Sequence, residues 1–149
     1  MKAYGLPSES GVQRHRRLGR LLRPHADVRR VGRSFAQFVL PNVNAAWVLQ
    51  TAHAFGASQG MRLATVTPNQ AVFTKGSVLW TGERWLSVGA WDVPGGTSVL
   101  VEAWVEGMGQ LNADPTSFLG MVPRRDMWTI ASTFVAGLGV NPNAVFRHL

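Results

Sequence analysis

Hydrophobic side chains dominate residues 84–108, which read RWLSVGAWDVPGGTSVLVEAWVEGM. Two segments rich in Val, Trp and Leu flank Pro94-Gly95-Gly96, and a short connection that contains Gly commonly reverses a strand. The pattern therefore predicts a β-hairpin. We expect Val93 to lie opposite Thr97 across a three-residue turn, and this pairing sets the register of both strands.

The expected register divides the hairpin into two faces, because alternate side chains of a strand point to opposite sides. Trp85, Trp91 and the valines of residues 99–105 form one apolar face, which we expect to be core. The second face is apolar in its middle and charged at its ends, where Arg84 is expected to pair with Glu106. An antiparallel sheet that is free on one side normally has a polar face, so we expect a helix, a second subunit or a ligand to cover part of the second face. Its candidate interface or ligand residues are Leu86, Val88, Leu100 and Trp104.

Two further strands are expected before the hairpin. Residues 61–67 and 70–80 have strand-like patterns, and Pro68-Asn69 forms a turn between them. Thr81-Gly82-Glu83 then turns the chain into the hairpin. Because short turns join neighbouring strands, the pattern predicts an antiparallel meander of four or five strands.

Two helices are expected to flank the meander. Asn42 is the predicted N-cap of a helix over residues 43–55, with Gly56 as its C-terminal stop. Pro123 suits the first turn of a final helix that runs to about residue 138, where Gly139 ends it.

Charge divides the chain into an arm and a body. Residues 1–34 hold nine basic and two acidic side chains, whereas residues 35–149 hold six of each, so the net charge of +7 belongs to the arm. Large apolar side chains are few in the arm, which predicts a flexible segment with little core of its own. Residues 35–149 are expected to form a single α+β domain, in which the meander packs with one helix before it and one after it.

The arm is the leading functional feature of the sequence. Eight arginines occur within residues 14–33, and guanidinium groups pair with phosphates while keeping their charge. Nucleic acid or a ribonucleoprotein is therefore the first expected partner. An anionic membrane surface is the nearest competitor, because RRLGRLLR is a short basic amphipathic segment. The residues assigned to the contact are Arg14, Arg16, Arg17, Arg20, Arg23, Arg29, Arg30 and Arg33.

Targeting is a further interpretation of the same region. An Arg-rich, acid-poor N-terminus resembles organelle-targeting peptides, and Arg29-Arg30, Phe35–Leu40 and Ala52-His53-Ala54 together resemble an export signal. The apolar part of that signal is short and interrupted by polar residues, so a cytoplasmic protein is the first expectation. A solvated arm without a partner is the remaining interpretation.

No group of residues predicts catalysis, a cofactor or a metal. Cysteine is absent, which excludes disulfides, thiolate zinc sites and cysteine nucleophiles, and the four histidines have no ligand spacing. Residues 56–60, GASQG, match the nucleophile pattern G-x-S-x-G, but that motif needs a strand before the Ser and a helix after it. Here a helix is expected before Ser58 and a strand after it, so we predict no enzyme.

The sequence thus predicts a non-catalytic binding module, whose arm docks on nucleic acid and whose neutral body contacts protein. Two alternatives belong to other classes. The second face of the hairpin suits an apolar-ligand (lipid) carrier or a domain that forms homo-oligomers, with the arm serving targeting or a membrane surface. A basic arm also suits a coat-like assembly subunit.

Overall fold

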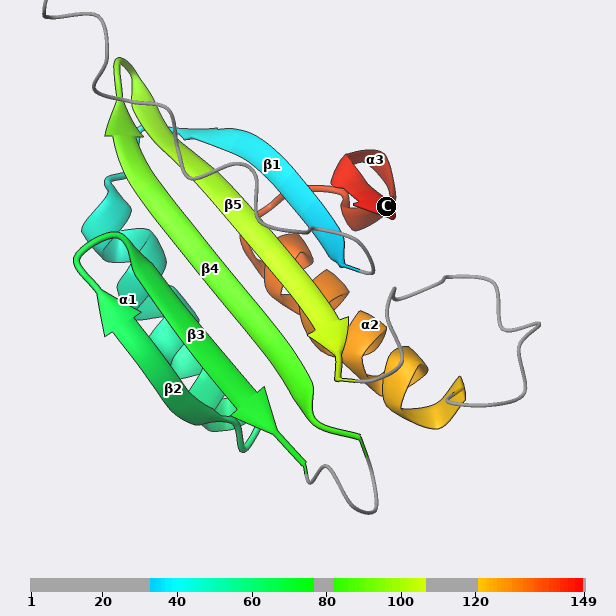
Figure 1. Cartoon of the computed structure of the whole chain (residues 1–149). Helices are drawn as coiled ribbons and strands as arrows, with labels where there is room; N and C mark the ends of the chain where they lie inside the picture. Colours follow the sequence, from blue (N-terminus) through cyan, green and yellow to red (C-terminus); the bar gives the residue numbers. More distant parts are fainter. Residues whose placement is uncertain (1–32, 77–81, 107–120, 149) are drawn as a thin grey trace, which may run out of the picture.

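The structure is a computed structural model that describes residues 33–76, 82–106 and 121–148. A six-stranded antiparallel sheet has the order β2-β3-β4-β5-β1-β6, and helices α1 and α2 lie on the same side of it (Figure 1). The predicted α+β class is confirmed, with more strands than the four or five expected. The elements are β1 (Ser34–Pro41), α1 (Ala45–Ser58), β2 (Arg62–Thr67), β3 (Gln70–Lys75), β4 (Arg84–Val93), β5 (Gly96–Val105), α2 (Met121–Gly137), α3 (Pro142–Val145) and β6 (Phe146–His148).

The turn between β4 and β5 is shorter than expected. Val93 lies opposite Gly96, so only Pro94 and Gly95 occupy the turn. The ring of Pro94 fixes its φ at about −65°, and Gly95 has a φ of +84°. These are the values that a type II turn requires at its two central positions. The predicted pairing of Val93 with Thr97 is therefore wrong by one residue.

A register shift of one residue changes which side chains share a face of the hairpin. Leu86 and Val88, which we expected on the second face, are fully buried on the side that α1 and α2 cover, together with the valines of β5. Trp85 and Trp91, which we expected in the core, lie on the opposite side. We call this sheet surface, which points away from α1 and α2, the outer face.

Strand β1 is absent from the sequence-based prediction, and it lies between β5 and β6 (Figure 1). Its pairing with β5 begins with Ser34 opposite Ala103. Ala36 and Leu40 are buried on the helix side, while the odd-numbered side chains between them point to the outer face. Strand β1 therefore brings Arg33, the end of the basic arm, directly to the sheet.

Helix α1 begins two residues later than predicted. Asn44, not Asn42, is the N-cap, and its side chain accepts a hydrogen bond of 2.8 Å from the backbone N–H of Trp47. Gly56 does not stop the helix, because it lies inside it and packs against the ring of Phe73. A Cβ at Gly56 would come within 2.7 Å of Cδ1 of that ring. The glycine therefore allows close packing of α1 on β3.

Helix α2 agrees more closely with the prediction. It begins two residues before Pro123, its Met127 and Phe134 are buried as expected, and Gly139 follows it with a φ of +81°. Further along, Phe146 packs edge-on against Trp128 on α2, with ring centroids 5.1 Å apart. This aromatic contact holds β6 against α2.

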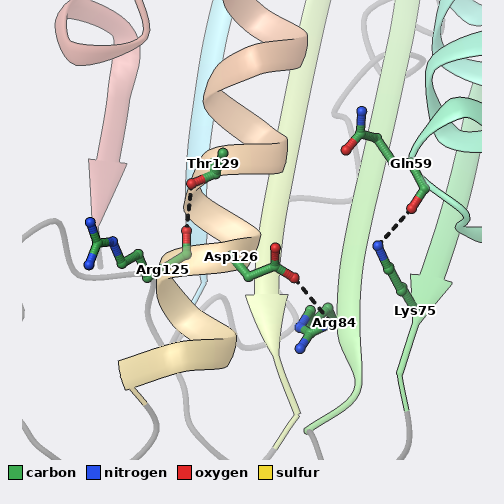
Figure 2. A network of polar contacts seen from close by, with 6 residues as sticks. All are labelled: Gln59, Lys75, Arg84, Arg125, Asp126 and Thr129. Atoms are coloured by element: carbon green, nitrogen blue, oxygen red, sulfur yellow. Dashed lines mark hydrogen bonds and ion pairs between the residues drawn. The ribbon is translucent and has the colours of Figure 1, made fainter.

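Charged side chains tie each long helix to the sheet (Figure 2). Lys75 Nζ on β3 donates a hydrogen bond of 2.8 Å to the carbonyl of Gln59, the C-cap of α1, where a cation complements the partial negative charge of the helix end. Arg84 on β4 pairs with Asp126 on α2 at 3.1 Å. The predicted pairing of Arg84 with Glu106 is wrong, because the observed register turns Arg84 toward α2.

Asp92, at the end of β4, holds the start of α1 in place. Its Oδ1 accepts a hydrogen bond of 2.6 Å from the backbone N–H of Ala45, the first residue of the helix. Thr97 Oγ1 lies 3.3 Å from the same oxygen and also donates to the carbonyl of Val43 at 2.7 Å. A carboxylate at a helix N-terminus satisfies a free N–H group and the helix dipole together.

Replacing Asp92 with Ala is therefore expected to lower the free energy of unfolding by about 1–2 kcal/mol. Asp92→Asn retains an acceptor oxygen but loses the charge, so we expect it to recover part of that loss. Urea denaturation followed by circular dichroism measures both variants. An Asp92→Ala protein with an unchanged unfolding midpoint would contradict the capping role.

Candidate nucleic-acid interface

Aromatic rings gather at one end of the outer face. Trp85 on β4 lies directly opposite Trp104 on β5, and their indole rings are parallel to within 1° with centroids 5.7 Å apart. The guanidinium carbon of Arg33 lies 3.9 Å from the centre of the Trp104 ring. Such a cation–π contact contributes about 0.5–1 kcal/mol at an exposed site. The basic arm and the sheet therefore meet at Trp104.

The other end of the outer face carries Trp91, which is 38% exposed. Its six-membered ring lies over Gly89, where a Cβ would come within 2.5 Å of Cη2. Val39 on β1 is 59% exposed, and Leu100 on β5 is half-buried opposite Gly89. Because Gly89 has no side chain, the ring of Trp91 packs directly on the sheet within an apolar patch.

Polar side chains separate the two ends of the outer face. Glu102 on β5 lies opposite Ser87 on β4 and next to Phe35 on β1, and it is only 9% exposed. Gln70 Nε2 on β3 donates a hydrogen bond of 2.8 Å to Ser87 Oγ. Ser87 and Glu102 thus form a polar strip between the two apolar ends of the outer face.

Two arginines on the edge strands border the aromatic end. Arg62 on β2 is opposite Thr74, which is itself opposite Trp85, and Arg147 on β6 is opposite Phe35. Both arginines are exposed. Because residues that face each other in antiparallel strands share one side of the sheet, these cations lie at the two margins of the outer face.

The predicted site residues fall into three groups. Arg33 lies on the outer face, while the other seven arginines of the arm lie outside the described residues. Leu86 and Val88 are buried core residues, so the prediction that they form an interface is wrong. Leu100 and Trp104 do lie on the outer face.

Sequence reasoning assigns Trp85 and Trp91 to the core and thus misses their place on the outer face. The signal that locates them is the dipeptide Pro94-Gly95, because Pro and Gly suit the two central positions of a type II turn. A two-residue turn starts β5 at Gly96 and pairs Trp85 with Trp104. Whether Gly96 belongs to the turn or to β5 therefore determines which face of the sheet carries Trp85 and Trp91.

The helix expected before Ser58 and the strand expected after it are both present, since α1 ends at Ser58 and β2 begins at Arg62. Ser58 is in the last turn of α1, where its Oγ donates a hydrogen bond of 2.7 Å to the carbonyl of Phe55. Within residues 33–76, 82–106 and 121–148, no group of three or more His, Cys, Asp or Glu side chains is arranged to hold a metal ion. None of the described helices has the length and apolar character needed to cross a membrane.

A comparison with models of protein families found no match for this chain, and a search of curated proteins found no similar sequence. The chemistry of the residues on the outer face is therefore the guide to function.

Proposed function

We propose that this protein is a non-catalytic module that binds nucleic acid or a ribonucleoprotein, with the arginines of residues 14–33 contacting the phosphate backbone. The observation that carries the proposal is the position of Arg33. It is the last of the eight arginines, and its guanidinium lies 3.9 Å from the centre of the Trp104 ring. Arg33, at the C-terminal end of the cationic segment, therefore lies on an aromatic surface. Nucleic acid has phosphates that pair with arginine and base rings that stack on aromatic side chains.

The distribution of charge also supports a nucleic-acid partner. The net charge of +7 belongs to residues 1–34, whereas residues 35–149 are balanced. Arginine pairs with phosphate through two parallel hydrogen bonds and stacks on planar groups. Contacts of this kind do not depend on base sequence, so binding by the arm is expected to be general and strongly dependent on salt.

The salt dependence of binding tests the proposal. If six arginines neutralise duplex phosphates, log K falls with log salt with a slope of about −5. Replacing the seven arginines before Arg33 with Ser is expected to reduce the slope to about −3 or less in magnitude, because Arg33, Arg62 and Arg147 are the cations that remain at the outer face. Fluorescence anisotropy with a labelled RNA duplex at several KCl concentrations measures both slopes.

Replacing the same arginines with Lys is the matched control, since it keeps the charge and loses the bidentate geometry. The Lys protein should retain the steep slope and bind more weakly at each salt concentration. If the Ser protein kept the slope of the natural sequence, the arm would not be the phosphate-binding element.

Self-association is the second candidate function. Val39 and Trp91 expose 59% and 38% of their surface on the outer face, and Leu100 lies between their strands on the same side. Exposed apolar groups that cluster in this way often mark interfaces. The residues that first suggested an apolar-ligand carrier, Leu86 and Val88, are instead packed in the core, so a carrier loses part of its support.

A further inference from the structure

We infer that the outer face gives this protein a preference for single-stranded nucleic acid, with bases stacking on Trp91 and on the pair formed by Trp104 and the guanidinium of Arg33. The inference rests on the proposed function and adds the class of nucleic acid to it. Phosphates are common to single strands and duplexes, so the arginine arm alone does not distinguish them. Exposed base rings are a property of single strands, because in a duplex the bases already stack on one another.

The two tryptophans are positioned before any ligand binds. Trp104 packs beside Trp85 in a parallel arrangement, and the guanidinium of Arg33 lies over its ring. A base at this end of the outer face therefore meets the guanidinium plane, which stacks on bases as an aromatic ring does. Trp91 rests over Gly89, which has no side chain to push the ring away from the sheet. Rings that are already held in place lose little conformational freedom on binding. Stacking of a base on such a ring contributes affinity without regard to which base it is.

The spacing of the two rings suits several nucleotides. The ring of Trp91 lies over Gly89, which is opposite Leu100 on β5, and Trp104 follows Leu100 four residues later on the same strand. At about 3.3–3.4 Å per residue, the ring of Trp91 lies about 13 Å from the position of Trp104 along the strand. A base at each end of this distance leaves room for intervening nucleotides across the polar middle of the outer face.

Charge sets the orientation of a bound strand. Arg62 and Arg147 on the edge strands, and Arg33 just before β1, attract phosphates toward the margins of the outer face. Base rings are therefore favoured over the sheet, and phosphates over the arginines.

Charge also favours nucleic acid over a second copy of the chain. Each copy of the chain carries a net charge of +7, and like charges oppose association. A nucleic-acid strand has the opposite sign and relieves that repulsion. The outer face is thus better matched to a polyanion with exposed rings than to itself.

The test separates bases from phosphates. The full-length protein is titrated into labelled single-stranded DNA of about 12 nucleotides, a length within the usual range of single-strand sites. The same measurement is made with an abasic strand of equal length, which has the phosphates but no base rings, and with a duplex of the same sequence. We expect the single strand to bind about a hundredfold more tightly than the abasic strand, because two stacked bases each contribute about tenfold.

Three tryptophan variants test whether the outer face is the source of the preference for a single strand. Trp91→Ala and Trp104→Ala are each expected to weaken binding of the single strand about tenfold and to leave binding of the abasic strand unchanged. Trp47→Ala is the matched control, because Trp47 is 46% exposed on α1, away from the outer face. Trp104→Ala removes packing around Trp85 as well, so Trp91→Ala keeps the test valid if the Trp104 variant unfolds.

The outcomes distinguish the two proposals. Equal affinity for the single strand and the abasic strand would overturn the stacking inference and leave the phosphate-binding arm intact. Absence of binding to all three ligands would overturn both proposals. Equal affinities together with a dimer whose mass halves on Trp91→Ala in sedimentation would overturn the inference and assign the outer face to a second copy of the chain.

Discussion

Replacing Leu86 with Ala is expected to lower the free energy of unfolding by about 2–5 kcal/mol, whereas Leu100→Ala is expected to cost about 1 kcal/mol or less. Leu86 is fully buried between the sheet and the helices and belongs to the main hydrophobic core, so its loss leaves a cavity there. Leu100 lies half-buried on the outer face, where solvent can occupy the space that Ala leaves. The two substitutions are chemically identical, and only their face of the sheet differs.

Urea denaturation followed by tryptophan fluorescence measures both free energies. The pair also tests the register of the hairpin. With Val93 opposite Thr97, Leu86 and Leu100 would share a face, and the two losses would be similar. Similar losses would therefore contradict the pairing of Val93 with Gly96, while unequal losses in the stated order support it.

Residues that interrupt helices and strands made much of the fold predictable. Pro68-Asn69 separates β2 from β3, Pro94-Gly95 separates β4 from β5, and Gly139 follows α2, each close to its expected place. Such residues act locally, because the φ angle of Pro and the φ range of Gly depend little on the rest of the chain. The α+β class follows from their order.

The register of the hairpin was not predictable from hydrophobicity alone. Large apolar side chains occupy both faces of β4, with Leu86 and Val88 on one side and Trp85 and Trp91 on the other. A pattern that is apolar on both sides does not distinguish two registers that differ by one residue. Turn geometry decides between them, and it depends on whether Gly96 belongs to the turn or to the strand.

Strand β1 escaped prediction for a related reason. Phe35 and Val39 on its outer side are as apolar as Ala36 and Leu40 on its buried side, so the segment does not alternate clearly. It is a strand because β5 and β6 provide hydrogen-bond partners on both of its edges. Those partners are distant in sequence, and local propensity does not contain them.

The candidate interface combines a predictable part with an unpredictable one. The arginine run is evident from composition, and its suitability for phosphate follows from the chemistry of the guanidinium group. The contact of Arg33 with Trp104 depends on the pairing of β1 with β5. An outer face that holds Trp85, Trp91 and Trp104 together emerges only once the register is known.

Replacing Gly96 with Ala is expected to lower the free energy of unfolding by about 3 kcal/mol or more. Gly96 lies opposite Pro41, and an added Cβ would overlap the carbonyl oxygen of Leu40 and come within 2.9 Å of its carbonyl carbon. Backbone atoms on a paired strand cannot rotate away as a side chain can, so β1 must move from β5 at this point. Amide hydrogen exchange should accelerate along β1, and urea denaturation should show the loss of stability.

Gly137→Ala is the matched control for that substitution. Gly137 is the last residue of α2, and an added Cβ would have no atom within 4 Å, so we expect a change of about 0.5 kcal/mol or less. Gly96 pairs with Pro41, at the opposite end of the β1–β5 ladder from Ser34 and Ala103. The contact of Arg33 with Trp104 should therefore persist in Gly96→Ala, and single-strand binding should be unchanged under conditions in which the protein stays folded. If Gly96→Ala matched Gly137→Ala in stability, the close approach of β1 to β5 would not be what requires glycine at residue 96.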